Sequence, residues 1–207
     1  MKVKIGIDID NVLSESYPAY LLRFNEKFNI EIKMEQIREF YFLDRLIKDE
    51  KTGKRGEMVN FIDELMLDAE FQVGIPPIVD SIEIIKKWSN QGFQIHYITA
   101  RPVTIRKMTE DWLNKHGYLV KGAKVDLYDN KKHINDTDFK REIADKNNIC
   151  VFIEDALEIA MGMDIPVFLL DYPWNQGKLK ENIVRVSSWK EIDEKLSTVL
   201  KGVVNKN

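Results

Sequence analysis

Short apolar runs alternate with longer amphipathic stretches along most of the chain, which is typical of strand–helix units. Apolar runs that are too short for helices predict strands at residues 2–8, 93–98, 124–128, 150–153 and 166–170. Apolar positions at helical spacing predict helices at residues 78–90, 102–116, 138–147, 155–163 and 188–200. Because strands that alternate with helices usually pair in parallel, the pattern predicts an α/β fold with a parallel sheet flanked by helices.

One long segment interrupts this alternation. About seventy residues without a convincing strand separate the first predicted strand from the helix at 78–90, and their apolar spacing predicts helices at residues 17–28, 34–48 and 57–67. A crossover between parallel strands needs only about a dozen residues, so we expect an insertion. We predict that residues 14–75, called the cap segment below, form a small helical cap, and that residues 1–13 and 76–207 form the α/β core.

Composition and charge exclude several classes of protein. The 31 Lys and Arg residues against 34 Asp and Glu residues give a net charge of −3, which argues against a nucleic-acid polymer as partner. No apolar run approaches the roughly 18 residues of a membrane helix, and the N-terminal one is too short for a signal peptide. We therefore expect a cytoplasmic protein without a membrane partner; a homodimer stays open. The single Cys150 excludes an internal disulfide framework and a cysteine-built zinc site.

Polar residues with catalytic potential follow the predicted strands at the points where these strands end. They are Asp8, Asp10, Thr99, Arg101, Lys140, Glu154 and Asp155, with Lys140 at the start of a helix rather than after a strand. Right-handed crossovers place the carboxyl ends of parallel strands at one edge of the sheet, where ligands bind. We therefore expect carboxylates, a hydroxyl and an ammonium to meet in one crevice.

Such a crevice favours phosphoryl chemistry. Clustered carboxylates suit Mg²⁺, which takes hard oxygen ligands and usually combines one or two carboxylates with substrate phosphate oxygens. The hydroxyl and the ammonium would serve the other phosphoryl oxygens. One carboxylate can attack phosphorus and form an aspartyl-phosphate, and a second, two residues further on, can protonate the leaving oxygen and later activate water.

These residues carry a resemblance to a known superfamily. The order Asp8-x-Asp10, Thr99, Lys140 and Glu154-Asp155 resembles the haloacid dehalogenase (HAD) superfamily of phosphotransferases, whose core is Rossmann-like and in one branch carries a cap after the first strand. The stretches 98–102, 109–117, 152–155 and 167–176 resemble the 5′(3′)-deoxyribonucleotidase-like family of cytosolic type C nucleotidases. The resemblance implies a Mg²⁺-dependent phosphomonoesterase for a small phosphorylated metabolite, with a (deoxy)nucleoside 5′-monophosphate as the leading substrate.

The resemblance also implies roles for individual residues. Asp8 would be the nucleophile and Asp10 the general acid and base, while Asp8, the backbone carbonyl of Asp10, and Asp155 would bind the metal. Glu154 would either contact the metal ligands without binding the ion or be a metal ligand itself. Asn11 stands where many members have glycine, and asparagine tolerates the same left-handed turn.

The resemblance gives the phosphoryl group its own partners. Thr99 and Lys140 would hold it. Arg101 would either clamp the phosphate as well or lie in solvent at the start of a helix.

The aromatic run 40–42 in the cap segment has two interpretations. It is either core, or Tyr41 and Phe42 stack on a nucleobase above the phosphate site. Other functions also stay open, namely a HAD phosphatase for a sugar phosphate and, in a different class, a non-catalytic receiver-like or binding domain. A receiver has its phosphorylated aspartate at the end of a middle strand ahead of the threonine, and no such strand lies between the cap segment and Thr99.

Overall fold

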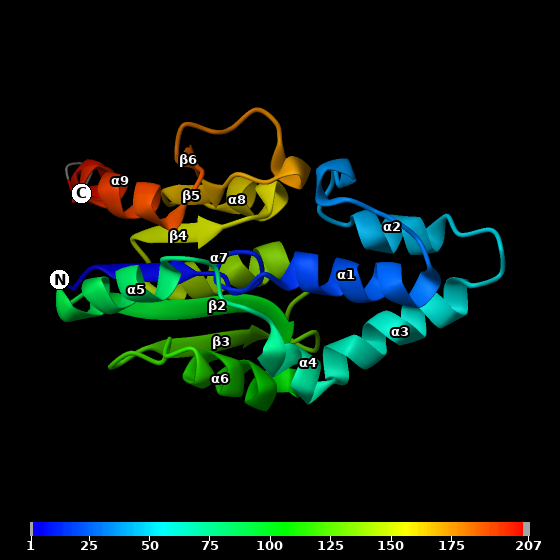
Figure 1. The fold of residues 1–207 in the computed structure, drawn as a ribbon. Helices are drawn as coiled ribbons and strands as arrows, with labels where there is room; N and C mark the ends of the chain where they lie inside the picture. Colours follow the sequence, from blue (N-terminus) through cyan, green and yellow to red (C-terminus); the bar gives the residue numbers. More distant parts are fainter. Residues whose placement is uncertain (1, 205–207) are drawn as a thin grey trace.

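The computed structural model describes residues 2–204, which contain one six-stranded sheet in the order β3-β2-β1-β4-β5-β6 (Figure 1). Its strands are β1 (Lys4–Ile7), β2 (Gln94–Pro102), β3 (Lys124–Tyr128), β4 (Val151–Glu154), β5 (Val167–Leu170) and β6 (Ile183–Val186). Every neighbouring pair is parallel. The predicted α/β fold is therefore confirmed, and β6 at one edge is an addition to the five predicted strands.

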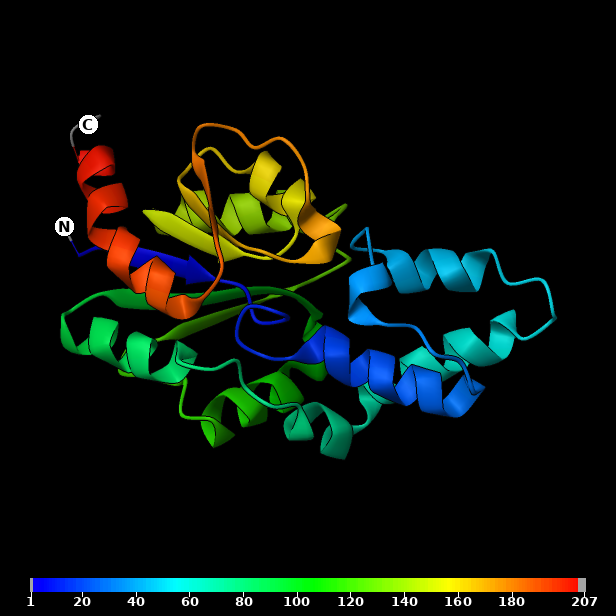
Figure 2. The ribbon, with the colours of Figure 1, turned by 45° about the horizontal axis from the view of Figure 1, so that its top comes forward.

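Helices cover both faces of the sheet (Figures 1 and 2). One face packs against α5 (Ser81–Asn90), α6 (Arg106–Lys115) and α9 (Trp189–Val204), and the other against α7 (Asp136–Asn147) and α8 (Leu157–Gly162). The first face buries Ile5 and Ile7 of β1, whereas Gly6 between them faces Phe152 and Ile149 on the other side of the sheet. A Cβ at Gly6 would lie 2.5 Å from the Phe152 ring, so the close packing of this face requires a glycine there.

The cap segment is helical and extends away from the sheet beyond the carboxyl ends of the strands (Figure 1). Its helices are α1 (Ser16–Phe28), α2 (Phe42–Lys48), α3 (Arg55–Leu67) and α4 (Ala69–Gly74). Phe24 and Phe28 of α1 pack against Ile47 of α2 and Met58 of α3. The cap segment therefore has an apolar cluster of its own, apart from the two that cover the sheet.

The single helix predicted over residues 34–48 is wrong. A 3-10 turn, η1 (Met34–Gln36), ends at Ile37, whose backbone is extended, and α2 begins only at Phe42. Ile37 is fully buried in a cluster with Leu21 and Trp174, and this contact holds the chain out of a helix at this point. Two further short turns, η2 (Val103–Ile105) and η3 (Pro173–Asn175), follow β2 and β5.

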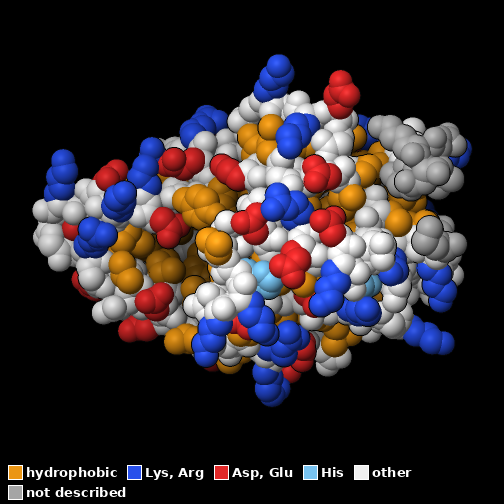
Figure 3. Space-filling model, turned by 180° about the vertical axis from the view of Figure 1, so that it is seen from behind, with side chains coloured by type: hydrophobic (Ala, Val, Ile, Leu, Met, Phe, Trp, Pro, Cys, Tyr) orange, Lys and Arg blue, Asp and Glu red, His pale blue; other side chains and the backbone are white. Residues whose placement is uncertain are grey.

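The surface carries charges of both signs over the core. Figure 3, which views the molecule from behind, shows hydrophobic side chains gathered around a hollow in the half that the cap segment forms. Among residues 2–204 no helix combines the length and the apolar character needed to cross a membrane.

Candidate active site

The strand order places three carboxylates at one point of the sheet. Because β1 lies between β2 and β4, the order of the strands reverses there, and open α/β sheets bind ligands at the carboxyl end of such a point. Asp8 follows β1, Glu154 ends β4 and Asp155 comes next. One carboxylate oxygen of each lies within 4.8 Å of the others, and all three side chains are buried. We call these three residues the acidic group.

Lys140 enters the acidic group from α7. The Asn135 side chain caps this helix by accepting a hydrogen bond from the Asp138 N–H at 2.8 Å, and Lys140 lies in the following turn. Its Nζ donates to Glu154 Oε2 at 2.9 Å and lies 3.0 Å from Asp8 Oδ1, an ion pair without hydrogen-bond geometry. Burial alone would lower the pKa of Lys140, but the two carboxylates outweigh it and hold that pKa above its usual value.

The acidic group carries more negative charge than Lys140 compensates. Burial raises the pKa of Asp8 to about 7, with Lys140 opposing the shift and Glu154 adding to it. Burial and Glu154 also raise the pKa of Asp155. Within residues 2–204, Asp8 Oδ1 is buried and accepts no hydrogen bond. Buried oxygens of this kind fit Mg²⁺, which takes carboxylate ligands and would offset the excess charge.

The oxygens of Glu154 are occupied by the protein itself. Oε2 accepts from Lys140, and Oε1 accepts from the backbone N–H groups of Asp155 and Ala156, each at 3.2 Å. Asp155 is held differently, because its Oδ2 accepts from Asn11 Nδ2 at 3.1 Å and from Trp174 Nε1 at 3.2 Å. Both oxygens of the Glu154 carboxylate are thus bound to protein groups, whereas these hydrogen bonds hold Asp155 through Oδ2.

Asp10 lies outside the acidic group, in a pair with Arg101. Arg101 Nε donates to Asp10 Oδ2 at 2.9 Å and Nη2 donates to Oδ1 at 2.7 Å, while Ser16 Oγ donates to Oδ1 at 2.5 Å. The register of β2 against β3 shifts between Thr99 and Pro102, in the stretch that contains Arg101. Burial acts to raise the pKa of Asp10, but the guanidinium outweighs it, and the pKa lies below its usual value.

The other predicted site residues are Thr99 in the core and Tyr41 and Phe42 in the cap segment. Thr99 is fully buried in β2, and its Oγ1 accepts from the Arg101 N–H at 3.2 Å. Tyr41 of the cap segment is 51% exposed, and its hydroxyl donates to Asp136 at the start of α7 at 3.4 Å. Phe42 packs in the apolar cluster that contains Ile37, so the structure places Tyr41 rather than Phe42 at the surface between the cap segment and the core.

Aromatic side chains fix the loop that follows β1. The backbone carbonyls of Asn11, Val12 and Leu13 accept hydrogen bonds from Tyr172, Trp189 and Tyr118 at 2.9, 2.8 and 3.3 Å, respectively. Sequence reasoning missed these contacts, because apolar spacing predicts aromatic residues only as core. Their effect is to hold in place the backbone that carries Asp8 and Asp10.

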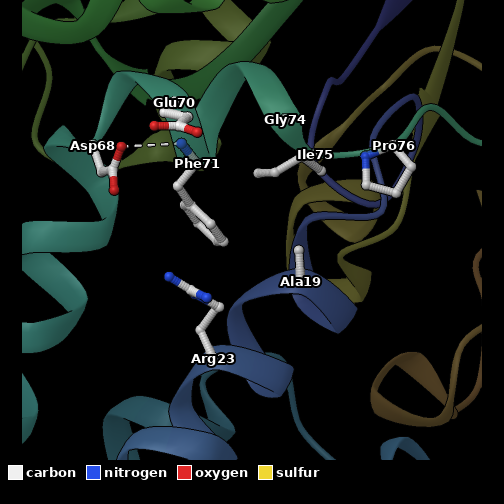
Figure 4. A pocket seen from close by; sticks show the side chains of 8 residues that line it. All are labelled: Ala19, Arg23, Asp68, Glu70, Phe71, Gly74, Ile75 and Pro76. Atoms are coloured by element: carbon white, nitrogen blue, oxygen red, sulfur yellow. Dashed lines mark hydrogen bonds between the residues drawn. The ribbon is translucent and has the colours of Figure 1, made fainter.

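A separate cavity of about 400 Å³ lies between α1 and α4. In Figure 4, Arg23 of α1 faces Phe71 of α4, and Asp68 accepts from the Phe71 N–H. No residue of the acidic group is among those that line it, so this cavity is distinct from the candidate active site.

Comparisons with known proteins identify the family and the fold. Residues 1–202 match the family described as 5′ nucleotidase, deoxy (pyrimidine), cytosolic type C protein. The chain is 26% identical to the "Putative nucleotidase" of Bacillus cereus, over 93% of this chain and 97% of that protein. Its fold is similar to that of CbbY from Rhodobacter sphaeroides in complex with phosphate (TM-score 0.61, 14% identity, 93% and 96% of the two chains). It is also similar to the "putative HAD-hydrolase YfnB from Bacillus subtilis bound to magnesium" (TM-score 0.57, 13% identity, 95% and 99% of the two chains).

Proposed function

The chain belongs to the family of cytosolic type C 5′ nucleotidases and is a phosphomonoester hydrolase with a HAD core, and from this premise we propose that it hydrolyses a nucleoside 5′-monophosphate with Mg²⁺ as cofactor. The observation that carries the proposal is the buried acidic group with the Lys140 ammonium beside it. The magnesium bound to YfnB and the phosphate bound to CbbY, which share the fold, support it. The family description supports a cytoplasmic location.

Asp8 and Asp155 would hold the metal ion, together with the backbone carbonyl of Asp10. Glu154 would not be a direct ligand, because Lys140 and two backbone N–H groups already occupy its oxygens. When bound, Mg²⁺ withdraws charge from phosphoryl oxygens and offsets the buried carboxylates. Lys140, Thr99 and Arg101 are the phosphate-binding groups in this proposal, as donors to the remaining phosphoryl oxygens.

The reaction proceeds in two displacements at phosphorus. An Asp8 carboxylate oxygen attacks phosphorus, the bond from phosphorus to the ester oxygen breaks, and Asp10 gives its proton to that leaving oxygen. Water then attacks the phosphorus of the aspartyl-phosphate and gives a proton to Asp10. The bond between Asp8 and phosphorus breaks, which releases inorganic phosphate and restores both carboxyl groups.

Asp10 must be protonated before the first displacement, whereas the Arg101 pair favours its charged form. The dianionic phosphoryl group of a substrate competes for the same guanidinium, since arginine binds carboxylates and phosphates with the same planar geometry. Substrate binding would therefore draw Arg101 toward phosphate and allow Asp10 to take up a proton.

The cap segment supplies the specificity in this proposal. It has its own apolar cluster, and it reaches the core at Tyr41, whose hydroxyl contacts Asp136 of the helix that carries Lys140. The half-exposed Tyr41 ring offers a flat surface on which a nucleobase can stack. Phe42 would contribute by supporting Tyr41 from the apolar cluster beneath it.

Phosphate release tests both parts of the proposal. We expect Mg²⁺-dependent release from nucleoside 5′-monophosphates, and a loss of roughly 1000-fold or more in kcat for Asp8→Asn, which keeps the size of the side chain. Activity that survives Asp8→Asn would refute the nucleophile. Nucleotides that are ignored while sugar phosphates are hydrolysed would refute the substrate class and leave the phosphatase intact.

The test of the proposed role of Tyr41 uses a substrate without a nucleobase as its control. Tyr41→Ala should raise KM for nucleotides by about tenfold, corresponding to the loss of one stacking contact, and should leave KM for p-nitrophenyl phosphate nearly unchanged. An equal rise in both KM values would mean that Tyr41 acts on the phosphate site rather than on the base.

A further inference from the structure

The Asn11 side chain makes two hydrogen bonds in opposite directions. Its Nδ2 donates to Asp155 Oδ2 at 3.1 Å, and its Oδ1 accepts from the Tyr17 N–H at 2.8 Å. Asp155 belongs to the core, whereas Tyr17 lies in the first turn of α1 in the cap segment. An asparagine amide offers both a donor and an acceptor, so it can join a carboxylate to a backbone N–H.

A second path connects the same two residues. The Tyr17 ring stacks on Trp174 with centroids 5.2 Å apart, and Trp174 Nε1 donates to the same Oδ2 of Asp155. The stack continues to Tyr172 with centroids 4.2 Å apart, and the Tyr172 hydroxyl donates to the backbone carbonyl of Asn11. Tyr17 is therefore connected to Asp155 both through Asn11 and through Trp174. A displacement of α1 would change the surroundings of Asp155 along both paths.

The backbone of Asn11 does not by itself require an asparagine. Its φ of 56° lies in the left-handed region, which glycine adopts at no cost and asparagine adopts more readily than most residues. Glycine would fit this turn but would lose both side-chain hydrogen bonds. What asparagine adds at position 11 is therefore the connection between Asp155 and α1.

We propose that Asn11 is a positioning residue that ties the start of α1 to Asp155, so that Mg²⁺ affinity and the position of α1 depend on each other. The inference rests on the proposed function, which makes Asp155 a metal ligand. Groups that orient a metal ligand commonly contribute 10- to 100-fold to metal affinity. Such coupling is reciprocal, so an ion that fixes Asp155 also restrains α1.

The test is a set of three Asn→Gly substitutions, each made in the chain of 207 residues. Asn11→Gly removes the two side-chain hydrogen bonds and leaves the path through Trp174, while Asn29→Gly and Asn148→Gly are matched controls at exposed helix ends with nearly the same φ, 51° and 52°. Isothermal titration calorimetry with Mg²⁺ in the absence of substrate should show that the dissociation constant rises about tenfold in Asn11→Gly. The two controls should bind Mg²⁺ with the dissociation constant of the wild type. Hydrogen exchange adds a readout that needs no activity: Mg²⁺ should slow the exchange of the first-turn amides of α1 in the wild type and the controls, and less in Asn11→Gly.

Each outcome has one meaning. Weaker Mg²⁺ binding in Asn11→Gly alone, with a smaller Mg²⁺ effect on the exchange of the first-turn amides of α1, supports the inference. If Asn11→Gly binds Mg²⁺ as tightly as the wild type and Mg²⁺ slows hydrogen exchange in α1 to the same extent, the inference is overturned and the proposed function still stands. Equal weakening in a control overturns it as well, because the effect would then follow from a more flexible chain. If the wild type binds no Mg²⁺, the metal site of the proposed function fails and this inference fails with it.

Discussion

The Arg101 guanidinium binds both oxygens of the Asp10 carboxylate, with Nε 2.9 Å from Oδ2 and Nη2 2.7 Å from Oδ1. Two parallel hydrogen bonds fix the orientation of the carboxylate as well as its charge, which a lysine ammonium cannot do. Arg101 is 6% exposed and Asp10 is 34% exposed in their side chains, so the carboxylate is the more accessible member of the pair.

Replacing Arg101 by lysine keeps the positive charge of the side chain and removes its ability to form two parallel hydrogen bonds. We expect Arg101→Lys to lower kcat by up to about 100-fold, because an ammonium cannot bind the phosphoryl group through two parallel hydrogen bonds and so orients it less well, and to change KM little, because a cation stays beside the phosphate. Steady-state kinetics with the matched control Arg106→Lys, an exposed arginine that pairs with Glu110 at 3.1 Å, measures this. An unchanged kcat in Arg101→Lys would show that the phosphoryl group needs no orientation by the guanidinium.

Removing the ammonium from the acidic group should destabilise the fold. Lys140→Met leaves Asp8 and Glu154 buried without their cation, and breaking a buried ion pair in this way costs about 3–5 kcal/mol. Urea unfolding in EDTA measures the loss, and Glu154→Gln in the same chain should recover part of it. Lys107→Met, which breaks an exposed pair with Asp111, is the control and should change stability little. A similar loss in both variants would contradict the uncompensated charge at the acidic group.

Magnesium should stabilise the folded protein. An ion that binds only the folded state adds about 2.7 kcal/mol to the free energy of unfolding at a concentration 100 times its dissociation constant. Asp155→Asn, which keeps the side-chain shape, should abolish this gain, and thermal unfolding with Mg²⁺ and with EDTA measures it. Asp111→Asn, an exposed position on α6, should keep the full gain. A Mg²⁺ effect that persists in Asp155→Asn would place the ion elsewhere.

The free energy of unfolding should depend on pH through His96 of β2. It is fully buried on β2, neither ring nitrogen has a hydrogen-bond partner within residues 2–204, and burial together with Lys124 lowers its pKa. Because the unfolded chain binds the proton more readily, the stability that depends on neutral His96 is complete above the unfolded pKa of about 6.5 and falls as the pH drops below it. The slope is at most about 1.4 kcal/mol per pH unit.

His96→Leu provides the check on this pH dependence. It should flatten the fall in unfolding free energy between pH 7.5 and 5.5, measured by urea titration at each pH. A difference from the wild type that is the same at every pH would reflect packing alone and would rule out the titration of His96.

The alternation of apolar runs and amphipathic helices was enough to predict the α/β fold, because each element buries its own face against the sheet. The strand β6 was missed, since its four residues include Arg185 and it lies at the edge, where an apolar run need not be continuous. The helix predicted over 34–48 failed because helical spacing does not report that Ile37 is buried against Trp174, a residue far along the chain.

The candidate site was predictable to the extent that strand ends determine it. Asp8, Glu154 and Asp155 come together because they lie at the carboxyl ends of the neighbouring parallel strands β1 and β4, and Lys140 reaches them from α7, which packs against β2 and β3. The pair of Asp10 with Arg101 was not predictable, since it depends on the register shift after Thr99. Nor was the anchoring of Asp155 by Trp174, which depends on how the segment after β5 turns back over the sheet.

The central position of β1 has a consequence for synthesis on the ribosome. Ile5 is made well before its partners on either side, which are Ile95 of β2 and Val151 of β4. The nascent chain therefore carries β1 unpaired until β2 has emerged and with one open edge until Val151 has emerged, and chains released before Val151 expose that edge to aggregation. Since Glu154 and Asp155 follow directly, the last step that closes the sheet around β1 is also the one that completes the acidic group.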